Sequence, residues 1–352
     1  MSERSEARRT FWFRLLSLGL AALPGALGCR PEPTQPPDPD APTPALACDE
    51  IPVTLTRVEP DSELDAPSWV EVCTSCPVVE ATIVVEDGTG RGLPVEAAWT
   101  PLRECVVGLP TEPLPARPST PASVQLVDPL GRVAVWNFDM PLAEGRGADP
   151  VDLDGATWLL PLPEGAYRLL GGPELLPGAP GGLLLSLGTA DAEARRPLTF
   201  APVRGDGFQD TCEATATLST PATLLSRQVA LSVVSGDELP GGLVAERGAL
   251  QARLTEDGSA LLDVTLFAVV SLSLSEGVLG LPPDEACAAW EADLGFDPCI
   301  PCGPPSEGVA GLPACIPLLI EGARAERVPD PLLAIDAESI APDCRQTPDI
   351  AQ

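Results

Sequence analysis

Three cysteines near the C-terminal end could do chemistry, because Cys299, Cys302 and Cys315 lie within 17 positions of one another. A Cys-x-x-Cys pair can bind zinc, form a thiol redox centre or belong to a disulfide framework. A zinc site normally takes a second such pair from nearby, and the other one, Cys73 to Cys76, is more than 200 residues away. A redox centre of the thioredoxin type needs a βαβ unit, which this chain does not predict. We therefore expect disulfide bonds, with zinc and redox chemistry as less favoured alternatives.

The number of cysteines agrees with this interpretation. Eleven are present, and ten remain once Cys29 is set aside for a separate role at the N-terminus. Four of the ten lie in the first part of the chain and six in the second, and even counts in an exported chain are typical of disulfides. The candidates are Cys48, Cys73, Cys76, Cys105, Cys212, Cys287, Cys299, Cys302, Cys315 and Cys344. We expect bonds within each part, but six cysteines allow 15 connectivities, so the pairing stays open.

The residues that are absent exclude most catalytic machinery. The sequence contains no His, and all 21 of its basic residues are Arg. Without His there is no Ser-His-Asp or Cys-His relay and no His-Glu-x-x-His zinc site, and without Lys there is no Schiff-base amine and no phosphate-loop lysine. The chemistry that remains open depends on carboxylates alone, either glycoside hydrolysis by paired Asp or Glu residues or Ca²⁺ binding.

Two short motifs are weak candidates for ligand binding. Asp149, Asp152 and Asp154-Gly155 resemble the start of a Ca²⁺ loop, but no Gly and bidentate Glu follow at the required offsets. The glycine-rich segment 87–94 opens no helix, so a hairpin turn is favoured over a phosphate loop. We therefore expect no catalytic residue, no metal site and no cofactor.

The N-terminus predicts export and lipidation. Four Arg residues within positions 4–14 precede an apolar stretch, residues 15–27, that is too short to span a bilayer. It ends in Ala26-Leu27-Gly28-Cys29, which resembles the lipobox at which bacterial lipoproteins are cut and acylated. We expect residues 1–28 to be a signal peptide and Cys29 to carry the lipid; the alternative is an ordinary cleavage site beside an unrelated Cys. Residues 29–47, rich in Pro and Asp, predict an extended tether.

The charge of the mature chain limits its partners. Removal of residues 1–28 leaves 17 Arg against 49 acidic residues, a net charge of −32. Such a surface repels nucleic acid, so no nucleic-acid partner is expected. The expected partners are the membrane, through the N-terminal lipid, and an unidentified protein or glycan.

The elements that must position these residues are predicted to be β-strands. The 43 Pro and 32 Gly residues argue against a helical protein, and short alternating or β-branched segments recur between turns. In the first part of the chain they are 53–57, 68–73, 80–87, 95–99 and a hairpin over 122–138 that turns at Asp128-Pro129-Leu130-Gly131. They predict an antiparallel sandwich over residues 48–142.

A second antiparallel β-rich domain, bonded by disulfides, is expected over residues 147–352. Its strand segments are 149–170, 181–188, 228–236 and a hairpin over 249–274. In that hairpin every second residue from Leu262 to Leu274 is apolar, which predicts one buried face. A single short helix begins at Pro282-Pro283-Asp284-Glu285, places Cys287, Trp290 and Leu294 on one face and ends at Gly295.

Two resemblances extend these expectations. The segments RVEPDSELDAPSWVEVC (57–73) and GLPTEPLPARPSTPASVQLVDPLGRVAVWNF (108–138) resemble, in their order, the bacterial Ig-like domains of surface-layer and adhesin-like proteins. That resemblance covers about residues 50–140 and implies an Ig-like sandwich. The layout of the whole chain, with its signal, Cys29, tether, sandwich and cysteine-rich end, resembles lipoproteins of high-GC Gram-negative bacteria, most of which have no assigned activity. It implies an outer-membrane anchor, at the periplasmic face or the cell surface, and no catalytic residue.

The expected function is therefore a non-enzymatic binding or scaffold module of the cell envelope. The alternative is a β barrel that binds lipid or another small apolar ligand, which would need an apolar cavity within residues 147–352. A carboxylate hydrolase is a third possibility, and it would need two carboxyl groups about 5–10 Å apart in a cleft.

Overall fold

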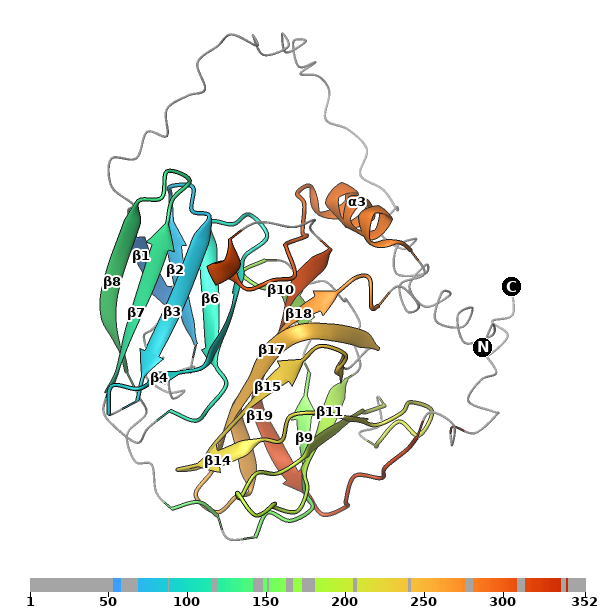
Figure 1. The fold of residues 1–352 in the computed structure, drawn as a ribbon. Coiled ribbons are helices and arrows are strands. Elements are labelled where there is room, and N and C mark those ends of the chain that lie inside the picture. Colours follow the sequence, from blue (N-terminus) through green and yellow to red (C-terminus); the bar gives the residue numbers. More distant parts are fainter. Residues whose placement is uncertain are drawn as a thin grey trace, which may run out of the picture.

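The computed structural model describes residues 53–57 and 69–340, except for gaps at 88, 115–118, 142–147, 151, 163–166, 173–180, 205–207, 240–241, 276–280, 309–313 and 337–339. The chain is mainly β, as the sequence predicts, and its strands pair antiparallel (Figure 1). The predicted signal peptide (1–28) and tether (29–47) lie outside the described residues, and so does the predicted boundary between the two domains, which falls within 142–147.

The first part of the chain forms two four-stranded sheets that pack face to face. One sheet has the order β1 (Val53–Arg57), β2 (Val70–Thr74), β6 (Cys105–Pro110), β5 (Val95–Trp99), and the other β4 (Gly92–Leu93), β3 (Glu80–Glu86), β7 (Ser119–Val127), β8 (Val133–Pro141). We call this unit the N-terminal sandwich. Its core lies between the sheets, because alternate residues of each strand, such as Ala81, Ile83 and Val85 of β3, point inward.

Two details of the N-terminal sandwich follow directly from its sequence. The predicted turn at residues 128–131 joins β7 to β8, with the N–H of Gly131 donating to the carbonyl of Asp128 at 2.9 Å and Gly131 at φ +75°. At Gly108 the two sheets approach closely: a Cβ at this position would lie 2.7 Å from Cδ1 of Ile83. A larger residue at this position would force the side chain of Ile83 to shift.

The second part forms a large antiparallel sheet of eleven strands, which with its helix we call the C-terminal body. The main path runs β13-β12-β11-β9-β19-β18-β17-β15-β14, while β10 pairs with β19 and β16 with β17. The strands are β9 (Ala156–Pro161), β10 (Tyr167–Leu169), β11 (Gly182–Leu187), β12 (Leu198–Pro202), β13 (Ala216–Thr217), β14 (Thr223–Leu225), β15 (Gln228–Val234), β16 (Glu238–Leu239), β17 (Leu243–Leu254), β18 (Ala260–Ser271) and β19 (Cys315–Val328).

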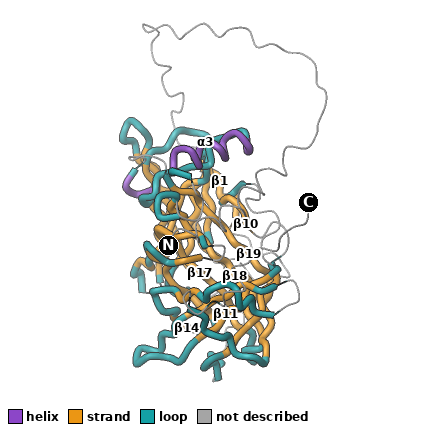
Figure 2. Tube along the Cα trace, turned by 90° about the vertical axis from the view of Figure 1, so that its right-hand side faces the viewer, coloured by secondary structure: helices purple, strands orange, loops and turns teal. Residues whose placement is uncertain are grey.

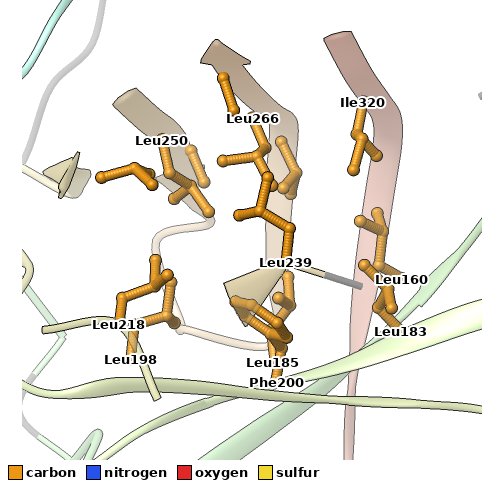
Figure 3. Packing of buried hydrophobic residues seen from close by; sticks show 14 of the residues in the cluster. Leu160, Leu183, Leu185, Leu198, Phe200, Leu218, Leu239, Leu250, Leu266 and Ile320 are labelled. Carbon is orange, nitrogen blue, oxygen red and sulfur yellow. The ribbon is translucent and has the colours of Figure 1, made fainter. Parts of the chain in front are cut away.

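This sheet folds over on itself, and its concave side is filled by side chains. In Figure 3, Leu250, Leu266 and Ile320 from β17, β18 and β19 lie opposite Leu160, Leu183 and Phe200 from β9, β11 and β12. These residues are all buried and belong to one hydrophobic cluster. The apolar side chains therefore pack against one another, as in an ordinary protein core.

One helix and one short 3₁₀ turn lie near one end of the C-terminal body, and β14 lies at the opposite end (Figure 2). Helix α3 (Pro283–Leu294) ends at Gly295, which has φ +79° and donates its N–H to the carbonyl of Glu291 at 2.8 Å. Cys287, Trp290 and Leu294 pack against the core, as predicted from their spacing. The 3₁₀ turn η1 (Pro305–Glu307) follows within the cysteine-rich segment.

The predicted alternation along β18 is only partly correct. Val264 and every second residue up to Leu272 face the C-terminal core, but the core residue at the start of the strand is Leu261 and not Leu262. A bulge causes the change: Gln251 pairs with Thr265 and Arg253 with Leu262, so β18 carries an extra residue, and Asp263 adopts φ +53°. Leu274 lies beyond the strand and is 49% exposed.

Candidate functional site: the junction between the two β units

The disulfides predicted from the sequence are present. Three bonds are described: Cys73–Cys105, Cys287–Cys299 and Cys302–Cys315. Cys76 and Cys212 are also disulfide-bonded. Each described pair stays within one part of the chain, as expected. Cys29, Cys48 and Cys344 lie outside the described residues, so the lipidation of Cys29 stays a prediction.

The cysteine-rich segment near the C-terminus is held by two of these bonds. Cys287 of α3 is bonded to Cys299, and Cys302 is bonded to Cys315, the first residue of β19. Between these bonds, Ile300 and Cys315 exchange backbone hydrogen bonds of 2.8 and 3.2 Å. The segment that follows Cys302, whose described residues 303–308 and 314 we call the strap, is thus closed at its base by a disulfide and a β-bridge.

The two β units meet at a largely apolar junction. On the side of the N-terminal sandwich it contains Trp69 and the outward-facing residues of the β5–β6 sheet, Ala98, Val107 and Leu109. On the side of the C-terminal body it contains Leu170, Ala249, Phe267, Val269, Leu319, Ile300 and Cys315. Both faces of β18 are therefore buried, since Phe267 and Val269 face the sandwich while their neighbours face the C-terminal core.

Arg247 is the central polar residue of this junction. Its Nη1 donates to the carbonyl of Ala97 at 2.5 Å and lies 3.3 Å from Oε2 of Glu96, both on β5 of the sandwich. Its Nε and Nη2 donate to the carbonyls of Cys302 and Gly303, at the base of the strap, each at 2.9 Å. One side chain therefore joins the sandwich, the large sheet and the strap.

A bulge in β17 directs Arg247 toward the sandwich. Ala245 pairs with Val270 and Arg247 with the adjacent Val269, so Glu246 is an extra residue in β17. Residues two apart in a strand normally share a face, but here Ala245 belongs to the C-terminal core while Arg247 faces the junction.

Burial perturbs both charged groups of the junction. The Arg247 side chain is only 12% exposed and the Glu96 side chain 30%. Burial raises the pKa of Glu96 and lowers the pKa of Arg247, and in each case the attraction between the two groups opposes the shift. Burying an arginine is tolerated only when its N–H groups are occupied, which the three carbonyls and the carboxylate achieve here.

Two glutamines complete the polar contacts across the junction. The side-chain amide of Gln251 donates to the carbonyl of Pro110 at 2.5 Å, and the side-chain oxygen of Gln228 accepts from the N–H of Leu114 at 2.6 Å. Both glutamines are buried. They satisfy backbone groups of the sandwich that the apolar surface of the C-terminal body would leave unpaired.

Comparison of the chain with family models, with curated proteins and with solved structures found no match. The function is therefore inferred from the chemistry of the described residues.

The acidic residues of the motif at 149–154 contact different partners and do not share one ligand. The Asp149 carboxylate accepts from the backbone N–H of Arg227, and the Asp154 carboxylate is ion-paired with Arg196. The carbonyl of Asp152 accepts from Arg327 at 3.3 Å. Each residue thus serves a different structural contact, which agrees with the predicted turn and not with a calcium loop.

The glycine-rich segment 87–94 forms the expected hairpin turn, and its pattern recurs. The Oδ1 atom of Asp87 accepts the backbone N–H groups of Thr89 and Arg91 at 2.7 and 3.0 Å. The same Asp-x-x-x-Arg arrangement closes the turns that begin at Asp128 and Asp191. Hydrogen bonding to Thr89 lowers the pKa of Asp87, and the pKa values of Asp128 and Asp191 are lowered by hydrogen bonds within their turns, against the effect of burial. These carboxylates cap turns.

One group of possible metal ligands comes together within the described residues. The carboxylate of Glu71 and the sulfurs of Cys73 and Cys105 lie within 4.8 Å of one another. The two sulfurs are bonded to each other, so neither is a thiolate that could bind zinc. This group therefore does not support a metal site.

Two further features of the described residues offer little for catalysis. A shallow depression lined by Thr255, Glu256, Asp257 and Ser259 lies over the β17–β18 turn, where Asp257 accepts from Thr255 and Ser259. Tyr167, the only tyrosine, is buried in the C-terminal core, and this burial raises the pKa of its hydroxyl. Across the described part of the chain, no helix is long and apolar enough to span a bilayer.

The junction residues were not predicted from the sequence. Arg247, Gln251 and Gln228 occur in strands whose neighbours are apolar, and such polar residues inside buried strands are an available signal. Their partners could not be found in this way, because Glu96 is 151 residues from Arg247 and Pro110 is 141 residues from Gln251.

Proposed function

We propose that this protein is a non-enzymatic lipoprotein of the cell envelope, whose two β units form one rigid binding or scaffold module on a lipid-anchored tether. The observation that supports this proposal is the junction around Arg247. Glu96 and Arg247, whose pKa values are shifted by burial, join the β units, and the other carboxylates with shifted pKa values close hairpin turns. Perturbed ionisable groups of an enzyme would instead gather in a cleft.

The strand order supports an Ig-like sandwich for the N-terminal unit. Lettered in chain order, with β4 as C′, the two sheets run A-B-E-D and C′-C-F-G, which is the arrangement of Ig-like domains. One difference is the disulfide: Cys73–Cys105 joins the neighbouring strands β2 and β6 of one sheet and does not cross between the sheets. Ig-like modules commonly act in binding and spacing, which agrees with the proposed role.

The cell-envelope location is proposed from the N-terminal sequence. The Arg-rich start, the apolar stretch and Ala26-Leu27-Gly28-Cys29 support export and acylation at Cys29, followed by a Pro/Asp-rich tether. Disulfide bonding of all eight cysteines in the described residues supports an oxidising compartment. The negative charge favours a protein or glycan partner over nucleic acid.

The two rival functions have less support. A lipid-binding barrel would need an open apolar interior, whereas the leucines of the folded-over sheet pack against one another (Figure 3). A carboxylate hydrolase would need an acid with a raised pKa beside a second carboxylate in a cleft, and Glu96, whose pKa is raised, is paired with Arg247 in the junction.

Membrane fractionation tests the anchor. Cys29→Ala should move the protein from the membrane to the soluble fraction and abolish metabolic labelling with a radioactive fatty acid, because the lipid supplies the membrane affinity. The matched control, Thr34→Ala in the tether, should stay in the membrane and remain labelled. Membrane association of unlabelled Cys29→Ala would contradict the proposal, as would a glycosidase activity that one carboxylate substitution removes.

A further inference from the structure

Strand β8 forms a long edge of the N-terminal sandwich. It pairs with β7 along its whole length, from Val133 opposite Val127 to Pro141 opposite Ser119, and no described strand pairs with its other side. It lies on the side of the sandwich away from the C-terminal body (Figure 1). A nine-residue strand therefore presents backbone N–H and C=O groups to which no described strand is bonded.

Other strands at the edges of the described sheets are short or protected. β4 and β13 have two residues each and β14 has three, β1 carries a bulge, and β5 contacts β17 and accepts a hydrogen bond from Arg247. Between Val133 and Met140, β8 has no bulge, no proline and one charged residue, Asp139. Bulges, prolines and charges normally keep edge strands from pairing, so their absence favours pairing of β8 with another strand.

The surface beside this edge is apolar and nearly neutral. Leu130, in the turn before β8, and Val133 and Val135 on β8 are 68%, 57% and 60% exposed. The net charge of −32 on the mature chain opposes contact between two copies, but along β8 only Asp139 contributes to that charge. Two copies can therefore approach each other at β8 with little electrostatic repulsion, and the exposed apolar side chains favour their association.

The sequence of β8 is complementary to itself. If two copies pair antiparallel with all nine residues overlapping, Asn137 lies opposite Asn137, Trp136 opposite Phe138, and Val135 opposite Asp139 of the second copy. The two amide side chains can donate to and accept from each other, and no charge faces a like charge. Within one chain, Trp136 and Phe138 have ring centroids 6.0 Å apart and are only partly buried against the sandwich core. The same two rings of a second copy would cover them.

We propose that two copies of this protein associate through β8. The strands pair antiparallel about a two-fold axis at Asn137, which joins two four-stranded sheets into one sheet of eight strands. A second copy is favoured over a strand of another protein because its aromatic residues meet aromatic residues and its one charged residue meets a valine. This inference goes beyond the proposed function and does not depend on the anchor or on the absence of catalysis.

Oxidative cross-linking of the purified mature chain, in a non-ionic detergent, tests this pairing. In Asn137→Cys the two new cysteines would face each other with Cα atoms about 4.5–5.5 Å apart, which is within the range of a disulfide. Oxidation with copper phenanthroline should therefore give a covalent dimer on a non-reducing gel. The matched control is Gln125→Cys, because Gln125 of β7 is exposed on the same face, opposite Val135. Three strand spacings would separate its two copies by at least about 14 Å, so no dimer should form.

Sedimentation equilibrium in a density-matched non-ionic detergent measures the association itself. Val135→Asp places a second carboxylate opposite Asp139 at two symmetric positions and should weaken the dimer about tenfold, whereas Val135→Lys opposes Asp139 with a positive charge and should not weaken it. Val135 is 60% exposed, so both variants should fold.

Three results would overturn the proposal. The first is a wild type that stays monomeric at about 100 µM, which would leave the edge to a strand of another protein. The second is equal weakening of the dimer by Val135→Asp and Val135→Lys. The third is equal cross-linking of Asn137→Cys and Gln125→Cys, or none in Asn137→Cys.

Discussion

Replacement of Arg247 by methionine should be among the most destabilising single changes in this protein. Methionine keeps the length of the aliphatic stem, so the loss of packing is small, but it removes every N–H donor. The carbonyls of Ala97, Cys302 and Gly303 and the carboxylate of Glu96 then lose a partner in a site where Arg247 is 12% exposed.

The magnitude follows from these contacts. Removing one member of a buried ion pair costs about 3–5 kcal/mol, and one buried acceptor left without a donor costs about 1–3 kcal/mol. These costs overlap, and Glu96 is 30% exposed, so water can solvate part of its carboxylate after the change. We therefore expect a loss of about 3 kcal/mol in the free energy of unfolding, at the lower end of that range.

Equilibrium unfolding in urea at pH 7, without reductant and followed by tryptophan fluorescence, measures this loss. The matched control is Arg91→Met, which removes a pair with Glu112 whose side chains are 63% and 39% exposed. Such a surface pair contributes about 0–1 kcal/mol, so the control should unfold nearly as the wild type does. The double variant Glu96→Gln/Arg247→Met should recover part of the loss, because no unpaired buried charge remains. If Arg247→Met costs no more than Arg91→Met, the junction does not depend on Arg247 and the reasoning is wrong.

Three further predictions concern the disulfides, the sandwich core and the turns. Peptide mapping of the unreduced protein should find the three described bonds and, because bonds stay within each part of the chain, Cys48–Cys76 and Cys212–Cys344; a bond that joins the two parts would contradict this. Gly108→Ala should lower the free energy of unfolding by about 1–3 kcal/mol, because its Cβ would lie 2.7 Å from Cδ1 of Ile83. The control Gly92→Ala, whose Cβ would lie 3.7 Å from its nearest atom, should be far milder. Thermal unfolding of both variants measures the difference. Hydrogen bonds from Ser259 and Thr255 lower the pKa of Asp257 from 3.8 to about 2, so its stabilising effect is complete above about pH 4 and is lost as the pH falls toward 2. Asp257→Asn should therefore reduce the acid dependence of the urea midpoint in that window, and an unchanged dependence would show that the turn does not contribute.

Local features of this protein were predictable because neighbouring residues decide them. The turn at Asp128 to Gly131 needs a residue that tolerates positive φ, and Gly131 supplies it. Helix α3 begins at the second of two adjacent prolines and ends at Gly295, and the spacing of Cys287, Trp290 and Leu294 defines its buried face. The even number of cysteines that remains once Cys29 is set aside likewise indicated disulfides before any pairing was known.

The junction was decided only by the tertiary structure, because its partners are far apart in the chain. Two bulges, at Glu246 in β17 and at Asp263 in β18, change which residues face the core, and strand periodicity cannot predict an inserted residue. Periodicity also predicts one buried face for β18, whereas docking of the sandwich buries both. Arg247 meets Glu96 across 151 residues, and nothing local to either residue specifies the other. The sequence determined the kind of strands, turns and crosslinks, and long-range packing determined that they form one joined unit.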